Sequence, residues 1–462
     1  MKPYIIYSVL TAMTFVAVGC EQSDYSDSTH PDVMNDVLLN FNVNINANGL
    51  RETRKLESSD CAQHVTDMRI YVFRSSTGGN DASFTYYRPQ VVGSDDPQDY
   101  FKVEAFDKID PITGHTPEEQ VYTIKPVLPT GYYRFIAVGR DDDSDTPEDN
   151  ITLNWDSNTT WNDALISTSA PRLSGEVFTG YPRQNDNTPR TFQVGRVTGF
   201  SATIDLYRAV AGVLLYVENI PDELPSEFSW NATRIVEITD EEGNTQETEE
   251  LYTIIKTEDK CEISEIAVVA PGYNNKMNLW PRHWVENSFI AETGLFTATT
   301  LVSIPVTDIR AEETMDSDGY YNVKRRLGSF VLPSQLAGRQ VELTYIPDAE
   351  DAQEVTYFFP ASMYLAFFTE KEGKKYPVKM LPICDSQQTS HFPGGPSFYT
   401  SDELAVRRTQ YNLICNNIYC LGDYRTEGPE IDEPINLKEV LNKPELNITV
   451  IGNWQADVDI NL

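Results

Sequence analysis

The residues from 36 to 55, DVLLNFNVNINANGLRETRK, contain a strictly alternating segment that starts at Leu39. Apolar side chains stand at every second position, Leu39, Phe41, Val43 and Ile45, and an asparagine follows each of them. Successive side chains of a β-strand point to opposite faces, so this period of two predicts a strand with one apolar and one polar face. Such a strand is stable only where a sheet or a groove covers its apolar face.

Short alternating or apolar runs recur along the chain, whereas long amphipathic helix patterns are scarce. Turn signals separate the runs, for example Glu-Gly-Asn at 242–244 and Asp-Gly at 318–319. The further expected strands are residues 65–74, 132–139, 200–220, 234–255, 343–346, 355–359 and 446–454. We therefore predict an all-β fold of the sandwich type, with a few short helices in the connections.

A weak internal repeat suggests two domains. The strand around Phe41 is followed by VTDMRIYVF, and the run ATIDLYRAVAGVLLYV at 202–217 is followed by TRIVEI. Each combination resembles the first two strands of a domain. We predict an N-terminal domain at 36–197 and a C-terminal domain at 198–462, with the boundary after the polar stretch 182–193.

The formal charge of −34 limits the classes of partner. A chain this acidic repels nucleic acid and anionic membrane surfaces, so a nucleic-acid binder is excluded. Because 40% of the residues are hydrophobic, the chain can build real cores and is no disordered polymer. The simplest reading of the charge is solubility outside the cell.

The N-terminus has the features of an export signal. Lys2 precedes an apolar run from Ile5 to Val18, which is too short to span a membrane as a mature helix. The run ends at Ala17-Val18-Gly19-Cys20, which resembles the lipobox of bacterial lipoproteins, although Ala17 replaces the usual leucine. We expect a signal peptide at 1–19 and lipidation of Cys20; the alternative is a plain secretory signal.

The residues that follow Cys20, EQSDYSDSTHPD, are polar, acidic and poor in apolar side chains. This composition is typical of a flexible tether rather than of a folded element. We therefore predict an acidic tether over 20–35. It resembles the acidic stretch that sends some Bacteroides-type lipoproteins to the outer face of the outer membrane.

Candidate catalytic and metal-binding patterns are absent from the sequence. The five histidines are scattered, and no nucleophile elbow occurs. Asp141, Asp143 and Asp145 match the first EF-hand ligand spacings, but Thr146 and Thr152 replace the required glycine and glutamate. We therefore expect a solvated acidic loop there, no metal, no cofactor and no enzymatic activity.

Five cysteines remain after Cys20, namely Cys61, Cys261, Cys384, Cys415 and Cys420. The expected compartment permits disulfides, but an odd number leaves at least one thiol free or paired between chains. We interpret these cysteines as structural, and the sequence leaves their pairing open.

Several stretches resemble the fimbrillin superfamily of Bacteroidales, the subunits of type V pili. They occur in the family's order over nearly the whole chain. The stretches are the lipobox cysteine Cys20, VTDMRIYVFR at 65–74, LPTGYYRFIAVG at 128–139, EVFTGYP at 176–182, IDLYRAVAGVLLYVENIP at 204–221 and LNITVIGNW at 446–454. The resemblance implies two tandem transthyretin-like β-sandwich domains and no catalysis.

The resemblance also implies a location and a set of partners. Family members cross the periplasm as lipoproteins, reach the surface of the outer membrane and assemble with other fimbrial subunits. We therefore expect a surface lipoprotein of the fimbrium, held in the membrane by the lipid on Cys20, with host or bacterial surface ligands as targets. In stalk subunits an arginine-specific protease removes the first strand, and the open groove accepts a strand of the next subunit.

Three roles follow from these expectations. The spacing of the motifs favours an accessory subunit, most like the lipid-retaining anchor. Cleavage at Arg51 or Arg54 would instead release the strand that carries Leu39, Phe41, Val43 and Ile45, as in a stalk subunit; alternatively, both arginines are ordinary surface residues. The third role is a surface glycan-binding lipoprotein, for which the six tryptophans at 155, 161, 230, 280, 284 and 454 are candidate platforms.

Overall fold

The structure of the chain is a computed structural model. It describes residues 33–44, 65, 67–93, 96–103, 119–140, 150–173, 175–184, 188–195, 199–239, 243, 245–280, 282–291, 296–345, 355–385, 408–425 and 431–451. Strands dominate these residues, and the two α-helices, α1 (Val306–Glu312) and α3 (Leu437–Val440), are short. The prediction of an all-β fold is confirmed. None of the helices in these ranges is long and apolar enough to cross a membrane.

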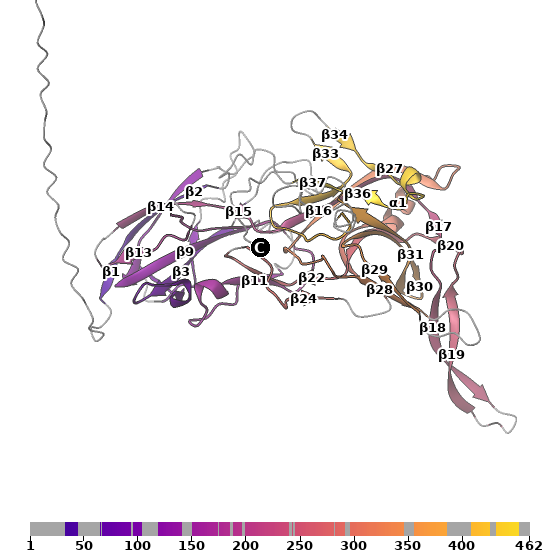
Figure 1. Ribbon diagram of the computed structural model, residues 1–462, viewed down its shortest axis with the longest axis horizontal. Coiled ribbons are helices and arrows are strands. Elements are labelled where there is room, and N and C mark those ends of the chain that lie inside the picture. Colours follow the sequence, from indigo (N-terminus) through magenta and orange to yellow (C-terminus); the bar gives the residue numbers. More distant parts are fainter. Residues whose placement is uncertain are drawn as a thin grey trace, which may run out of the picture.

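The N-terminal region is built on a seven-stranded sheet (Figure 1). Its strands are β3 (Asp67–Ser75), β4 (Thr85–Tyr87), β6 (Phe101–Val103), β9 (Gly131–Arg140), β12 (Val177–Gly180), β13 (Phe192–Val194) and β15 (Tyr207–Arg208). The order is β15-β12-β9-β3-β4, with β13 also pairing with β9 and β6 with β3. The motif stretches around 65–74, 128–139, 176–182 and 204–221 thus contribute neighbouring strands of one sheet.

This sheet is covered on both faces. On β3, Met68, Ile70 and Val72 belong to one apolar core, whereas Tyr71 and Phe73 belong to another on the opposite face. The two cores explain why the sequence of β3 is a nearly continuous apolar run rather than an alternating one.

A three-stranded sheet covers the first of these cores. It consists of β14 (Gly199–Asp205), β2 (Leu38–Asn44) and β7 (Glu119–Ile124), with β2 in the middle. The strand before β2 belongs to a second small sheet. Its order is β1 (Met34–Asp36), β8 (Pro126–Pro129) and β5 (Gln90–Val91). The alternating segment is therefore a central strand over the part that the structure describes.

The C-terminal region contains two five-stranded sheets that share one apolar core. The first consists of β27 (Tyr320–Val331), β16 (Ala211–Pro221), β32 (Ile418–Leu421), β37 (Thr449–Ile451) and β35 (Ile435–Asn436). The second consists of β26 (Thr299–Pro305), β21 (Glu265–Ala270), β30 (Tyr364–Lys371), β31 (Lys374–Cys384) and β36 (Leu446–Asn447). The facing sheets form a sandwich, as predicted.

Short elements complete the two regions. They are the 3-10 turns η1 (Asp81–Ser83) and η3 (Trp161–Asp163) and the strands β10 (Ile151–Thr152), β11 (Leu165–Thr168), β17 (Glu223–Pro225), β20 (Lys260–Glu262), β22 (Tyr273–Asn274), β23 (Lys276–Asn278), β24 (Phe289–Ile290), β25 (Phe296–Thr297), β28 (Val341–Tyr345), β29 (Val355–Phe359), β33 (Asp423–Arg425) and β34 (Ile431–Glu433). Strand β23 pairs with β11, so a segment of the C-terminal half packs onto the N-terminal region.

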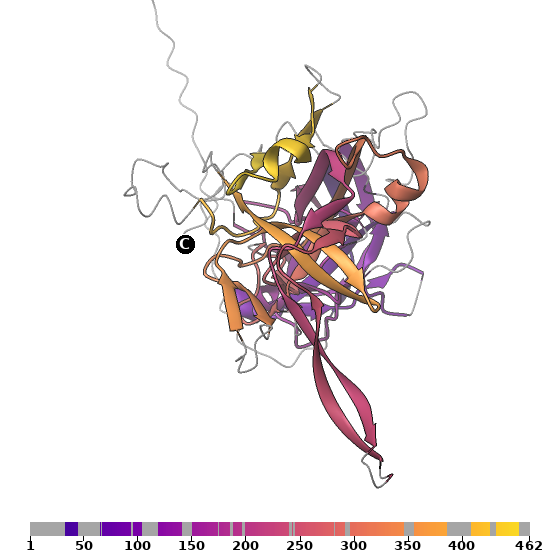
Figure 2. The ribbon, with the colours of Figure 1, turned by 90° about the vertical axis from the view of Figure 1, so that its right-hand side faces the viewer.

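A long hairpin projects from the C-terminal region (Figures 1 and 2). Its strands β18 (Trp230–Thr239) and β19 (Thr245–Ile255) pair only with each other among the described strands. The hairpin predicted over 234–255 is present, but the repeat inferred from TRIVEI is wrong at this point. That segment lies in the exposed hairpin and not in a sandwich core, because glutamates rather than apolar residues stand in register with it.

The boundary between the two predicted domains is best placed by sheet membership. Strand β14 pairs with β2 and β15 pairs with β12, so residues 199–208 share sheets with the N-terminal region. Strand β16, from Ala211, pairs with strands of the C-terminal region. We therefore propose a boundary after Arg208 instead of between 197 and 198.

Candidate functional site: the strand Leu38–Asn44 and its groove

Strand β2 is hydrogen-bonded along both of its edges. It runs parallel to β14 with Phe41 beside Ala202, and antiparallel to β7 with Phe41 beside Tyr122. The backbone groups of a central strand find partners on both sides, which a terminal strand at an exposed edge does not. Strand β2 thus fills a slot between two strands that do not pair with each other.

The apolar face of β2 is fully buried. Leu39 and Val43 have no exposed surface and Phe41 is 1% exposed. Burying three side chains of this size contributes about 5–9 kcal/mol before the cost of ordering the strand is subtracted. The alternation seen in the sequence therefore has the expected physical consequence at these three positions.

The floor of the slot is formed by the seven-stranded sheet. The ring of Phe41 meets that of Phe135 on β9 edge-on, with 5.1 Å between the ring centroids. Phe135 in turn contacts Phe192 of β13 in a similar edge-on arrangement at 5.5 Å. The same core includes Met68, Ile70, Val72, Leu128, Tyr133, Ala137, Phe178, Val194, Ile204 and Leu206. The sequence alone could not identify these residues as the lining, because they come from five distant segments.

The opposite face of β2 carries asparagines. Asn40 is half-buried, and its Oδ1 accepts a hydrogen bond from the Thr123 hydroxyl of β7 at 2.8 Å. Neutral amides can remain partly exposed or bond to a neighbouring strand without the cost of burying a charge. This face of β2 can therefore be partly exposed to solvent while the opposite face is buried in the core.

The chain enters the slot along a defined path. The backbone N–H of Val37 donates to the Pro126 carbonyl at 3.0 Å, and the side-chain amide of Asn35 donates to the Leu128 carbonyl at 3.3 Å. Strand β1 pairs with β8 immediately before β2 begins. These contacts hold the lead-in segment against the same body as β2.

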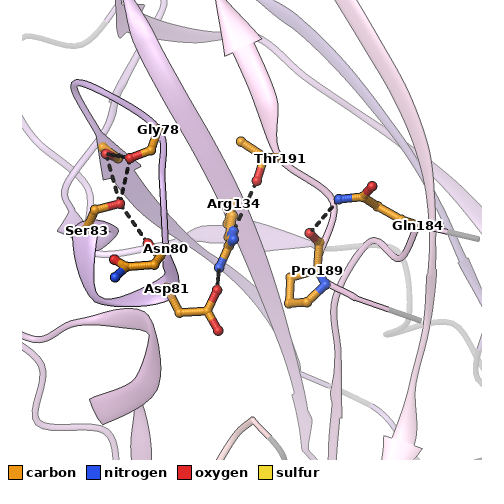
Figure 3. A network of polar contacts seen from close by, with 9 residues as sticks. Gly78, Asn80, Asp81, Ser83, Arg134, Gln184, Pro189 and Thr191 are labelled. Carbon is orange, nitrogen blue, oxygen red and sulfur yellow. Dashed lines mark hydrogen bonds and ion pairs between the residues drawn. The ribbon is translucent and has the colours of Figure 1, made fainter. Parts of the chain in front are cut away.

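The outer face of β9 is fixed by a buried arginine (Figure 3). Arg134 donates to Asp81 Oδ1 at 2.5 Å and to the Thr191 hydroxyl at 3.2 Å, so it joins η1 to the segment before β13. Its guanidinium lies 4.1 Å from the centroid of the Phe84 ring. Arg134 is only 7% exposed, and a buried charge needs such partners. The same contacts hold β9, the strand that lines the bottom of the slot.

Two of the family-like motifs meet beside the slot. Arg208 of β15 forms an ion pair with Glu176 at 2.5 Å, and the arginine is 2% exposed. Next to this pair, Gly180 of β12 approaches Asp205 of β14 so closely that a Cβ atom would overlap the Asp205 carbonyl oxygen. The glycine therefore permits the contact between the β2 sheet and the seven-stranded sheet.

Several predicted site residues lie outside the described residues. These are Cys20, Ile45, Arg51, Arg54, Cys61 and Trp454. Most of the acidic segment 139–149 lies outside them as well. The lipidation, the processing positions and the far end of the alternating strand therefore stay predictions.

Of the four described cysteines, Cys261, Cys384 and Cys415 are free thiols, and Cys420 is buried. Burial and the neighbouring Glu445 carboxylate raise the pKa of Cys384 to about 12. Burial likewise raises the pKa of Cys261 and of Cys415. Thiols held protonated in this way are poor nucleophiles, which agrees with a structural role.

The described tryptophans do not form exposed platforms. Trp161 and Trp230 are buried, whereas Trp155, Trp280 and Trp284 are half-buried. The Trp155 ring packs against Tyr71, with 4.7 Å between the centroids, and its N–H donates to the Leu165 carbonyl at 2.9 Å. Among the described residues no group of three or more potential ligands could hold a metal ion.

Comparison with known proteins gave matches only among solved structures. No family model and no curated protein matches the chain. The tip fimbrial protein Mfa3 from Porphyromonas gingivalis, with a C-terminal truncation, is 12% identical, with 91% of this chain and 100% of that one covered and a TM-score of 0.32.

Two further similar structures were found. The fimbrial anchor protein Mfa2 from Porphyromonas gingivalis is 9% identical at a TM-score of 0.29, and a fimbrial assembly protein from Parabacteroides distasonis is 11% identical at 0.28. Both alignments cover 75% of this chain and 100% of the other. Because these scores are low, we base the function on this chain's own residues. All three of these similar structures are fimbrial proteins.

Proposed function

We propose that the chain is a non-enzymatic surface lipoprotein that serves as an accessory subunit of a fimbrium, of the anchor or minor kind. The observation that carries this proposal is the placement of β2. One N-terminal strand fills a slot between β14 and β7, with three apolar side chains buried in it. In a polymer built by strand exchange, the slot of one subunit accepts a strand of the next. A chain that keeps its own strand in the slot cannot accept another and is therefore suited to end or anchor the polymer.

The sequence supplies the second part of the proposal. Cys20 would carry the lipid, and the acidic residues up to Val33 would connect it to β1, which begins at Met34 and so shortens the tether predicted over 20–35. More than one acyl chain is needed for stable anchoring, since each buried methylene contributes only about 0.8 kcal/mol. The partners are then the outer membrane, other fimbrial subunits and ligands on host or bacterial surfaces.

The alternative role is a stalk subunit. Arg51 and Arg54 follow β2 in the sequence, so cleavage after either would separate the strand from the rest of the chain. The slot would then be free for an apolar alternating strand of another subunit. The two roles differ in one peptide bond, and we favour the accessory role because of the motif spacing.

The experiment is mass spectrometry of the protein extracted from the cell surface. An N-terminus at a diacylated Cys20 is expected, and Cys20→Ala should release the protein from the membrane fraction. An N-terminus at Glu52 or Lys55 would replace the anchor role by the stalk role. Saturable binding to one member of a polysaccharide panel would favour the glycan-binding alternative, which the buried and half-buried tryptophans do not support.

A further inference from the structure

The hairpin of β18 and β19 is anchored only at its base. Trp230 and Ile255 are each 1% exposed, and the Trp230 indole donates to the Pro377 carbonyl at 2.9 Å. Beyond them the hairpin projects from the body as an isolated two-stranded ribbon (Figures 1 and 2). We call the part beyond this base, Asn231–Thr239 with Thr245–Thr253, the arm.

One face of the arm has its charges neutralised within the chain. Arg234 forms an ion pair with Glu250, which stands opposite it, at 2.7 Å, and its guanidinium lies 5.0 Å from the centroid of the Tyr252 ring. The Tyr252 hydroxyl donates to Glu372, in the turn between β30 and β31, at 2.5 Å. This face is therefore tied to the body at its base.

The other face, which we call the acidic face, has no such balance. It carries Ile235 opposite Glu249 and Glu237 opposite Glu247, with Leu251 nearer the base. Within the described part of the chain none of the three glutamates forms an ion pair. Ile235 is 68% and Leu251 48% exposed.

This composition is unfavourable for a free hairpin. Like charges directly opposite each other on a strand pair are destabilising, and a ribbon without a third strand is marginally stable in water. The segment 230–255 as a whole has seven carboxylates against one arginine. Its outer edges also present unpaired backbone groups that a further strand could use.

We propose that the acidic face is a docking surface for an extended, basic segment of another protein. Positions of one strand that share a face lie about 7 Å apart. A segment with an apolar side chain over Ile235 and Leu251 and lysines or arginines at alternate positions would meet the three glutamates in turn. A second copy is a poor occupant, because it presents the same acidic face on a chain of charge −34.

This docking is independent of the fimbrial role. None of the arm residues that it uses belongs to the slot of β2. The docking would therefore apply equally to an anchor, a stalk subunit or any other surface protein. The two can therefore fail separately.

The test uses the full chain and a fluorescent peptide of about ten residues. The peptide has a valine followed by lysines at every second position. A control peptide has the same composition with its lysines consecutive. Fluorescence anisotropy should show saturable binding of the first peptide that weakens as salt is raised. The triple variant E237Q/E247Q/E249Q should bind about tenfold more weakly, since three exposed charge pairs are lost.

The matched control is E258Q/E286Q/E370Q, which removes three exposed carboxylates elsewhere and should bind like the natural chain. Circular dichroism and thermal melts of both variants establish that each is folded. Equal binding by the two triple variants would overturn the proposal, because only net charge would then matter. Self-association that E237Q/E247Q/E249Q abolishes would also overturn it, by assigning the face to a second copy.

Discussion

Strand β2 and the arm are both extended, and they have opposite surroundings in the structure. Apolar side chains alternate strictly with polar ones in β2 from Leu39 on, whereas Ile235 and Val236 are adjacent in the arm and residues 245–250 include no apolar side chain. Asparagines separate the apolar residues of β2, whereas glutamates crowd the arm, where Ile235 stands beside Glu249 and Glu237 faces Glu247. Both segments are strands, and the charge of the intervening and facing residues decides whether a sheet can cover them.

The largest expected difference between the two is in backbone opening. Amides of β2 should exchange with solvent only when the whole N-terminal region unfolds, because both edges are paired and one face is buried. Amides of the arm should exchange through local opening, on the order of a thousandfold faster. Hydrogen exchange followed by mass spectrometry measures the exchange rates of β2 and of the arm in one sample. Equal protection of the two would contradict the expected difference.

Shortening the side chain of Phe41 should have the next largest effect. Phe41→Ala leaves a cavity beside Phe135 and should lower the free energy of unfolding by about 3–5 kcal/mol. The control is Val121→Ala on the neighbouring β7, whose side chain is 71% exposed. That control should change stability by less than about 0.5 kcal/mol. Denaturant titration gives both values, and similar losses would show that β2 is not held by its buried face.

The contact that closes the slot is sensitive to a single methyl group. Gly180→Ala places a Cβ against the Asp205 carbonyl oxygen and should cost about 1–3 kcal/mol through the shift that it forces. Gly199→Ala, in the same sheet as Asp205, meets its nearest atom at 3.4 Å and should be tolerated. Thermal melts separate the two variants. A stable Gly180→Ala protein would mean that the sheets can separate there without cost.

Charge substitutions in the arm should have small effects of opposite sign. Glu237→Gln removes a like-charge pair with Glu247 and should raise stability by about 0.5 kcal/mol at most. Glu250→Gln removes the partner of Arg234 and should lower stability by a similar amount. Local exchange rates in the arm are the most sensitive measurement. The same sign for both would show that the register of facing side chains does not control the arm.

Much of the fold could be predicted from the sequence. The strands at 65–74 and 132–139 occur as β3 and β9, and the hairpin over 234–255 occurs as β18 and β19. What could not be predicted is the long-range pairing. Nothing in the residues around Phe200 indicates that β14 runs parallel to β2, because parallel neighbours are joined by long connections that leave no local signal.

The candidate site was predicted only in part. Leu39, Phe41 and Val43 are buried as the alternation requires, whereas the lining residues from β3, β9 and β13 come together only through folding. The arginine of β15 illustrates the same limit. Its ion pair with Glu176 joins two motifs 32 positions apart, and neither motif by itself indicates a buried charge pair.

The sequence by itself determined which segments are extended, which of their faces are apolar, and how acidic the chain is, because these depend on side-chain period and composition. The tertiary structure decided where those faces are satisfied. It placed β2 between β14 and β7, with its apolar face on the β9 floor, and left the arm without a third strand. The physical reason is that burial depends on which distant strands supply a complementary surface. For β2 these strands supply an apolar slot. If a sheet covered the arm, its carboxylates would have to be buried without partners.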